Sequence, residues 1–310
     1  MNMNSEKILR EIADELHNSR DRKKTHFKMH ERIDQLSNDK KFIHESLLNC
    51  ISTKKFFSNA TNLFFYLLIE GDVIIAINIF PPNSNNMNDI THDNIHHHGW
   101  RLLSTSVISG QGYDTISFKK KSHENRDENR VLLEVEENYT HTKGGTKFLD
   151  SEQAHVVFHP KSTAATLAIW SADHPIKTQK IKKMFKRFPM INKYLSYTAR
   201  SMGLSDLFGL NSTKGNYFHP EGGIIVETRN YSKPHDGSVN EIVPCMFKFF
   251  EQIQFNDKKY FDKILNDNTQ DVQNLCNNLI QGEPLQDNGI SGDARRRFSK
   301  NQILDALNYN

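Results

Sequence analysis

The sequence is poor in cysteine, with three in 310 residues and none in a C-x-x-C pair. Cys50, Cys245 and Cys276 are far apart and odd in number, which gives no sign of a disulfide framework. Such isolated cysteines are typical of free, mostly buried thiols in a reducing compartment. The first twenty residues also lack the apolar stretch of a secretory signal. We therefore predict a soluble, cytoplasmic protein.

The sequence also has no large excess of positive or of negative charge. The formal net charge is +3, and the 25% of charged residues mix both signs. Bulk charge therefore favours neither a nucleic acid nor a membrane surface as the partner. We interpret the basic stretches 177–187 and 293–298 as solvated faces rather than as nucleic-acid sites.

The chain has no long apolar run free of charge. Its most apolar stretch, residues 63–80, contains Glu70, Gly71 and Asp72 near its middle. Two carboxylates in the centre of a membrane span would be costly in lipid. We predict two strands joined by a tight turn at these three residues, and no membrane segment.

Two widespread catalytic signatures are absent. No G-x-S-x-G supports a serine nucleophile, and the glycines of GGTKF at 144–148 lack the spacing of a phosphate-binding loop. The chain also shows no internal repeat. With these signatures absent, the histidines are the main candidates for a catalytic or metal-binding site.

The chain divides into three regions by pattern. Residues 1–58 and 176–310 are mostly helical in periodicity, the latter with one possible added strand at 222–231. Between them, residues 59–175 contain short runs rich in Val, Ile, Leu, Phe, Tyr and Thr, separated by turn signals. No helical pattern of ten residues lies between these runs, which disfavours a parallel sheet with crossover helices. We predict a mainly β core, a sandwich or barrel, with helical flanks in an α+β fold.

Four of the fifteen histidines fall within residues 92–98. On a strand, side chains alternate between faces, so His96 and His98 would point one way and His97 the other. Two histidines so placed can supply two ligands to one metal, and a third must come from elsewhere. His155, which opens an apolar strand, is our candidate for that third ligand. His92 is an alternative ligand.

The order of these features resembles the cupin superfamily, the double-stranded β-helix or RmlC-like jelly roll. A strand hairpin precedes HHH at 96–98; LLSTSVISGQGY, a lone His155 and TLAIWS follow. In cupins the first motif supplies His-x-His and usually a glutamate, and the second motif supplies one more histidine. The resemblance implies that His96, His98 and His155 are metal ligands. It covers roughly residues 60–175.

The usual glutamate of the first motif is missing, because Gly99 to Leu103 follow His98 without a carboxylate. A set of three histidines resembles the thiol dioxygenase branch, of which cysteine dioxygenase is the familiar member. That resemblance implies Fe(II) with open positions for a substrate and O2. His92 and Asp93 are adjacent rather than one residue apart, which argues mildly against the two-histidine, one-carboxylate oxygenases.

Three further residues are candidates for contact with a substrate. An arginine near a metal site can clamp a carboxylate with two hydrogen bonds, so we predict this role for Arg101. A structural salt bridge is an equal alternative for the same residue. Tyr113 and Tyr139 are candidates for a phenol beside the substrate.

We expect a mononuclear non-heme iron dioxygenase that acts on a small polar substrate, an amino acid or a thiol, together with O2. Imidazole ligands do not select iron, so Zn, Mn or Ni is an alternative metal. The alternative activities are an isomerase, lyase or hydrolase with the metal as Lewis acid, and a ligand-binding cupin without catalysis. The helical flanks are open to use as a lid, a homodimer contact or a partner surface.

Overall fold

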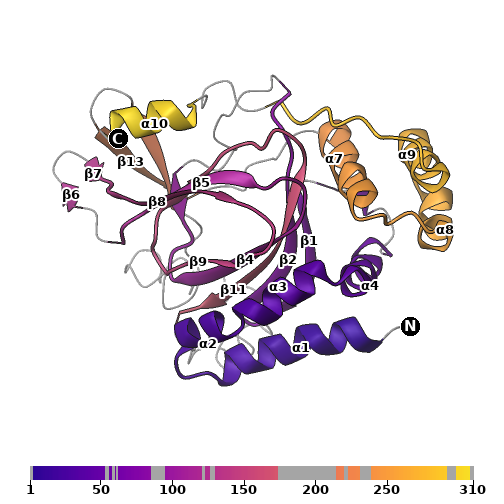
Figure 1. The fold of residues 1–310 in the computed structure, drawn as a ribbon, viewed down its shortest axis with the longest axis horizontal. Coiled ribbons are helices and arrows are strands. Elements are labelled where there is room, and N and C mark those ends of the chain that lie inside the picture. Colours follow the sequence, from indigo (N-terminus) through magenta and orange to yellow (C-terminus); the bar gives the residue numbers. More distant parts are fainter. Residues whose placement is uncertain are drawn as a thin grey trace, which may run out of the picture.

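The core of the protein is a pair of facing antiparallel β-sheets (Figure 1). The computed structural model describes residues 3–52, 56–57, 60, 62–84, 95–120, 123–125, 130–173, 214–219, 223–230, 239–291 and 298–307. The first sheet has the order β1-β2-β11-β4-β9 and the second the order β6-β7-β13-β12-β3-β10-β5-β8. The strands of the first sheet are β1 (Phe64–Glu70), β2 (Val73–Phe80), β11 (Ala164–Ala172), β4 (Arg101–Ser109) and β9 (Lys147–Leu149). Those of the second are β6 (His123–Asn125), β7 (Arg130–Leu132), β13 (Gly223–Asn230), β12 (Lys214–His219), β3 (His96–His97), β10 (His155–Val157), β5 (Tyr113–Phe118) and β8 (Val135–His141).

Eight of these strands form a jelly roll. The order β2-β11-β4-β9 in one sheet faces the order β3-β10-β5-β8 in the other. Strands that are distant in the sequence are therefore neighbours, as in the double-stranded β-helix. This order confirms the predicted β core with helices at both ends.

The hairpin predicted at the Glu70-Gly71-Asp72 turn is present. β1 pairs antiparallel with β2, with Glu70 opposite Val73. Gly71 has a φ of +61°, a backbone conformation that glycine adopts without steric cost. The apolar stretch is thus two strands of a sheet.

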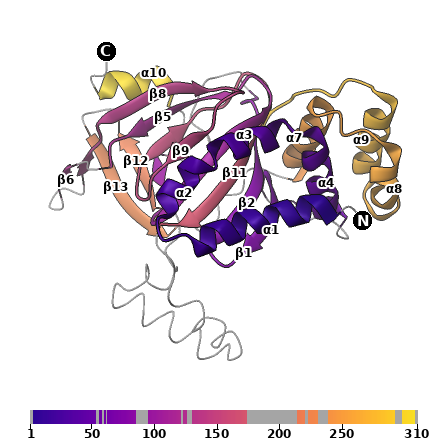
Figure 2. The same ribbon diagram turned by 60° about the horizontal axis from the view of Figure 1, so that its bottom comes forward.

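Helices cover the outer face of the first sheet. These are α1 (Met3–Asn18), α2 (Arg22–Lys28), α3 (His30–Asn38), α4 (Lys40–Ile51) and α7 (Val239–Gln252). Two further helices extend this layer: α9 (Gln270–Gln281) packs against α7, and α8 (Lys258–Asp267) packs against α9. Ile75 and Ile77 of β2 and Leu167 and Ile169 of β11 alternate onto this face and are fully buried in the same apolar cluster as these helices. Burying each such side chain stabilises the fold by about 1.5–3 kcal/mol. Figure 2 shows α1 to α3 lying across this sheet.

Among the described residues, one short helix covers the second sheet. α10 (Lys300–Ala306) places Ile303 against Ile116 and Val156 in a separate buried cluster. Its first turn carries a capping box, in which the Ser299 and Gln302 side chains each bond the other's backbone N–H. α10 therefore lies on the opposite side of the core from α1 (Figure 2).

Three strands lie outside the predicted runs. β9 lies among the turn signals that separate the predicted runs, and it pairs with β4 through three residues. β6 also falls in a predicted break, and β12 pairs with β13 and β3 in a region predicted to be helical. Strands of three to six residues among polar side chains carry too little alternation to be recognised locally. The predicted strand at 222–231 is confirmed as β13.

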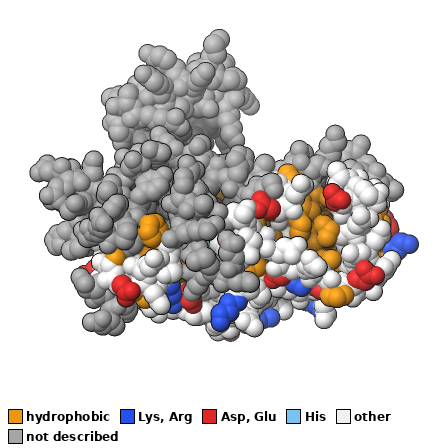
Figure 3. Space-filling view, turned by 90° about the horizontal axis from the view of Figure 1, so that it is seen from above, with side chains coloured by type: hydrophobic (Ala, Val, Ile, Leu, Met, Phe, Trp, Pro, Cys, Tyr) orange, Lys and Arg blue, Asp and Glu red, His pale blue; other side chains and the backbone are white. Residues whose placement is uncertain are grey.

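Within the described ranges, no helix is both long and apolar enough to cross a membrane. In Figure 3 the described surface carries basic and acidic side chains next to one another, with small apolar areas between them. The basic stretch 177–187 and nearly all of 293–298 lie outside the described residues, so their interpretation stays a prediction.

Candidate metal centre

Three histidines converge on the inner face of the second sheet. His155 of β10 lies directly opposite His96 of β3, and His98 follows β3. The ring centroids are 4.3 Å apart for His96 and His155, and 5.0 Å for each of the pairs with His98. One ligand atom from each ring lies within 4.8 Å of the other two. His96 and His155 are buried, and His98 is half-buried.

Strand alternation explains which way these rings point. Ile95 and Val156, next to His96 and His155 in the chain, are buried in the cluster under α10 on the outer face. Because neighbouring side chains on a strand point to opposite faces, His96 and His155 point to the inner face. The apolar neighbours thus orient the polar ligands.

The turn after His98 brings the two histidine segments together. Gly99 has a φ of +62°, and its carbonyl accepts a hydrogen bond from the backbone N–H of Glu152. This bond joins the turn after β3 to the turn before β10. A side chain at position 99 would strain the backbone here.

The donor set fits a divalent metal. Nitrogen–metal distances of 2.0–2.2 Å place two ligand nitrogens of one metal about 3 Å apart. The ligand atoms observed within 4.8 Å reach that spacing through small side-chain rotations. In the described part of the chain no carboxylate joins this group. Three neutral imidazoles could therefore hold one metal and leave coordination positions open for other ligands.

Arg101 lies at the same end of the core as His98. It begins β4, and its backbone N–H donates to the His98 carbonyl at 3.3 Å. Burial lowers the pKa of its guanidinium, while Asp72 and Tyr66 act in the opposite direction. Asp72 is paired with Arg22, and in the described part of the chain Arg101 has no ion-pair partner. The guanidinium of Arg101 is therefore available for the predicted role of pairing with a substrate carboxylate.

Tyr113 points into the core at a different point. Its ring packs on Phe80 at 4.1 Å between centroids. Burial is the main reason why the pKa of the His141 imidazole is lowered to about 4, so this ring is neutral at pH 7. Its Nε2 donates to the Gly145 carbonyl, which leaves Nδ1 to accept the Tyr113 hydroxyl proton at 3.0 Å. A role for Tyr113 beside the substrate stays a prediction, and its described hydrogen bond is to His141.

The other candidates are placed as follows. His97 is half-buried, and its Nδ1 accepts from the Gly99 N–H. His159 is buried, and its Nδ1 donates to the Pro81 carbonyl, because the chain after β10 packs against the end of β2. Tyr139 packs beneath the ammonium of Lys147. His92 and Asp93 lie outside the described residues.

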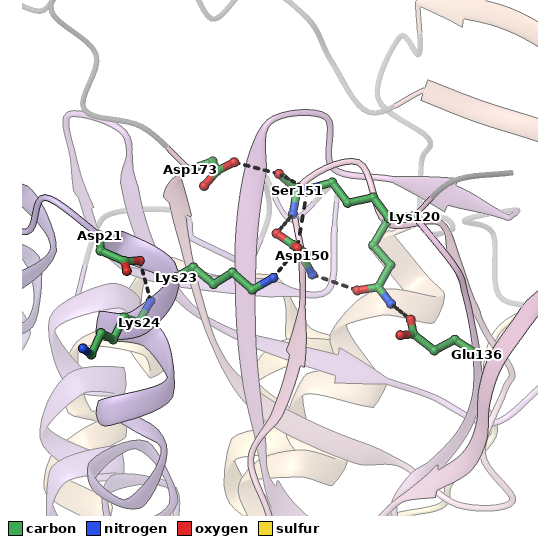
Figure 4. A network of polar contacts seen from close by, with 9 residues as sticks. Asp21, Lys23, Lys24, Lys120, Glu136, Asp150, Ser151 and Asp173 are labelled. Carbon is green, nitrogen blue, oxygen red and sulfur yellow. Dashed lines mark hydrogen bonds and ion pairs between the residues drawn. The ribbon is translucent and has the colours of Figure 1, made fainter.

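A polar network that the sequence did not reveal holds the turn before β10 (Figure 4). Asp150 pairs with Lys23 of α2 at 2.6 Å and with Lys120 at 3.4 Å. Ser151 donates to Asp173 and accepts from Lys120. Burial alone would raise the pKa of Asp150, but hydrogen bonds and the two lysines lower it overall. This network fixes the segment four residues before His155 to α2 and to the end of β11.

A second group of metal-type side chains lies on the surface. Asp14, His17 and Glu70 have ligand atoms within 4.8 Å of one another. Arg10 already lies 3.8 Å from Glu70, and Asp14 is exposed. The histidine cluster differs because two of its members are buried and all three are imidazoles.

Comparison with known proteins finds only solved structures of low similarity. No family model and no curated protein sequence matches the chain. A solved RmlC-like cupin with a double-stranded β-helix fold from Methanocaldococcus jannaschii is 13% identical, with a TM-score of 0.25, over 38% of this chain and 87% of that one. A cupin protein from Bacteroides fragilis is 13% identical, with a TM-score of 0.23, over 34% and 68%. The DMSP lyase DddQ from Ruegeria pomeroyi DSS-3 is 10% identical, with a TM-score of 0.23, over 34% and 40%.

The strand order therefore defines the class. The chain has a cupin-like double-stranded β-helix core with helices at both ends. Its inner face carries a three-histidine cluster that could bind a divalent metal.

Proposed function

We propose that this protein is a metal-dependent enzyme in which His96, His98 and His155 hold one divalent metal, with Fe(II) favoured. The convergence of three imidazoles on the inner face of the core carries this proposal. Its activity would be that of a mononuclear non-heme iron dioxygenase acting on a small polar substrate. When bound, the metal would bring substrate and O2 together and stabilise developing charge.

The chain's own residues would bind the substrate and hold it in place. His96 and His155 are buried, so their rings keep a fixed orientation. Arg101 would pair with a substrate carboxylate, since its guanidinium has two parallel N–H donors for this purpose. Trp170 lies with its ring 6.3 Å from that of His98 and, being 9% exposed, keeps water from that side of the cluster.

Lewis-acid chemistry with Zn or Mn is the second candidate. The donor set favours zinc as much as iron, because imidazole binds Fe, Zn, Cu and Ni alike. Under this candidate the activity would be that of an isomerase, lyase or hydrolase. A cupin that binds a ligand without catalysis is the third.

The test is elemental analysis of the untagged full-length chain beside a His96→Ala/His98→Ala variant. We expect about one metal ion per chain in the wild type, with most of it lost in the variant. His97→Ala is the matched control, because His97 lies between the two ligands and outside the cluster. It should keep its metal.

The identity of the metal decides the chemistry. Iron, followed by substrate-dependent O2 uptake in a screen of amino acids and thiols, would support the dioxygenase. Zinc or manganese without O2 uptake would replace it with the Lewis-acid candidate. A wild-type chain that binds none of these metals when they are supplied would overturn the metal proposal.

A further inference from the structure

An apolar strip is exposed at the edge of the first sheet. Tyr66 and Ile69 of β1 are 44% and 63% exposed. A bulge between Tyr66 and Leu68 shifts the register, so that Tyr66 lies opposite Ala76 and Ile69 opposite Ile74. Positions 74 and 76 share a face of β2. Tyr66 and Ile69 therefore lie on one face.

This strip is continuous with the histidine cluster through a row of rings. Phe64 stacks on Tyr66 with centroids 5.8 Å apart, and on its other side it contacts Trp170 at 6.1 Å. Trp170 in turn contacts His98 edge-on at 6.3 Å. A row of ring contacts thus runs from the exposed edge of β1 through the buried Trp170 to the candidate metal ligand His98. We call Phe64, Tyr66, Ile69 and Trp170 the rim strip.

A cation lies at the same rim. Arg101 pairs with Ala172 in the register of β4 and β11, two residues from the Leu103–Trp170 pair. It therefore shares a face with Trp170, one step further along the sheet. Tyr66 lies near enough to Arg101 to act on the pKa of its guanidinium, which it raises.

The nearby carboxylate is already engaged. Asp72 is buried, pairs with Arg22 and accepts the backbone N–H of Ala172 at 3.0 Å. Asp72 therefore already has a cation and a backbone donor as partners. A half-buried guanidinium beside an exposed apolar strip is complementary to a ligand with one negative group and an apolar body.

We propose that the natural substrate of this site is an amphipathic carboxylate, whose charged group meets Arg101 and whose apolar or aromatic body lies on the rim strip. This inference rests on the proposed function, since it names the substrate class of the same site. It narrows the proposed substrate class from small polar molecules in general to carboxylates that also carry an apolar group. Acetate or glycine alone would leave the rim strip uncovered.

Intrinsic fluorescence of the full-length chain can test this directly. The chain has two tryptophans, and both report on this rim: the Arg101 guanidinium lies 6.0 Å from the Trp100 ring, and Trp170 belongs to the rim strip. The probes are 3-phenylpropionate, its uncharged amide and acetate. We expect 3-phenylpropionate to bind at least about tenfold more tightly than either of the other two, a difference typical of losing one charge-assisted contact or one buried ring.

Substitutions separate the two parts of the ligand. Arg101→Met should weaken 3-phenylpropionate about tenfold or more and leave the amide unchanged, and Arg101→Lys should restore part of the loss. Tyr66→Ser/Ile69→Ser should weaken the carboxylate and the amide alike. Phe27→Ser is the matched control, because Phe27 is 48% exposed on α2, outside the rim strip. It should change neither affinity.

The same titration on His96→Ala/His98→Ala separates this inference from the metal proposal. Binding that survives without metal and still depends on Arg101 supports the inference even if the metal proposal fails. Equal binding of carboxylate and amide, or binding unaffected by Arg101→Met, overturns it. Binding of 3-phenylpropionate no tighter than that of acetate also overturns it.

Discussion

His26 is a titratable side chain sealed between a helix and the first sheet. It has no exposed surface, and its ring nitrogens bond the hydroxyls of Ser104 at 2.8 Å and Ser171 at 2.9 Å. Burial, with the charges of His30 and Arg22, lowers its pKa from 6.5 to about 3. The folded protein therefore keeps this ring neutral at pH values where an unfolded chain protonates it.

We predict that this residue makes the fold sensitive to acid. Above pH 6.5 both states hold His26 neutral, so it has no effect on the pH dependence of stability. As the pH falls from 6.5 towards 3, only the unfolded state gains the proton, and stability is lost. At pH 5 the loss is about 2 kcal/mol.

Urea unfolding at pH 7.5 and at pH 5.0 measures this loss. The difference in unfolding free energy between the two pH values should be smaller by about 2 kcal/mol in His26→Gln than in the wild type. Because each protein is compared with itself at the two pH values, any pH-independent effect of the substitution on the unfolding free energy cancels. An identical pH dependence in the two proteins would contradict the account.

At the scale of the element, β5 begins where the chain passes very close to β8. Gly112 has a φ of +87°, and a Cβ there would lie 1.9 Å from the His141 carbonyl oxygen. Gly144 has a similar φ of +93°, but a Cβ there would meet nothing within 4 Å. The two glycines share a backbone conformation and differ in the space around them.

Comparing substitutions at Gly112 and Gly144 measures how much the close approach of β5 and β8 contributes to stability. Gly144→Ala should cost about 1–2 kcal/mol, from backbone strain alone. Gly112→Ala should cost roughly 4 kcal/mol or more, because the methyl group must push β5 away from β8. Chemical denaturation of both variants measures the difference. Equal costs would show that the approach of the two strands relaxes freely.

At the scale of the whole molecule, the helices and the first sheet share one core. Ile12 of α1, Phe250 of α7 and Ile77 of β2 belong to the same buried cluster. The ion pair between Arg22 and Asp72 also joins α2 to the turn after β1, with both side chains about 2% exposed. Removing the helices would expose the outer face of the sheet to water.

We predict that helices and sheets unfold in one transition that a metal ion shifts. Far-ultraviolet circular dichroism, which reports mostly on the helices, and tryptophan fluorescence, which reports on the barrel rim, should show the same Tm. A metal at one hundred times its Kd should raise that Tm by roughly 5 °C, from about 2.7 kcal/mol of binding energy. His96→Ala/His98→Ala should keep the single transition and lose the shift. Two separate transitions would show that the helical flanks are independent units.

Much of the core was predictable because it depends on local patterns. Short runs rich in β-branched, aromatic and other apolar residues, separated by turn signals, indicated β1, β2, β4 and β11, and the Glu70-Gly71-Asp72 turn indicated how the first two are joined. The two-residue spacing of His96 and His98, with their common face, belongs to the same class of signal. The helical periodicity of residues 3–51 and 239–281 likewise comes from neighbours three and four positions apart.

The amino-acid sequence by itself therefore determined most of the strands and helices, and it nominated His155 as the third histidine. Only the tertiary structure decided that His155 lies opposite His96, that β9 and β12 join the sheets, and that Lys23 holds the turn at Asp150. It also decided that His159 is buried and that the rim strip leads from the exposed Tyr66 and Ile69 to His98. These contacts join residues tens to more than a hundred positions apart, and their energy comes from strand pairing and burial that exist only after the chain has closed on itself.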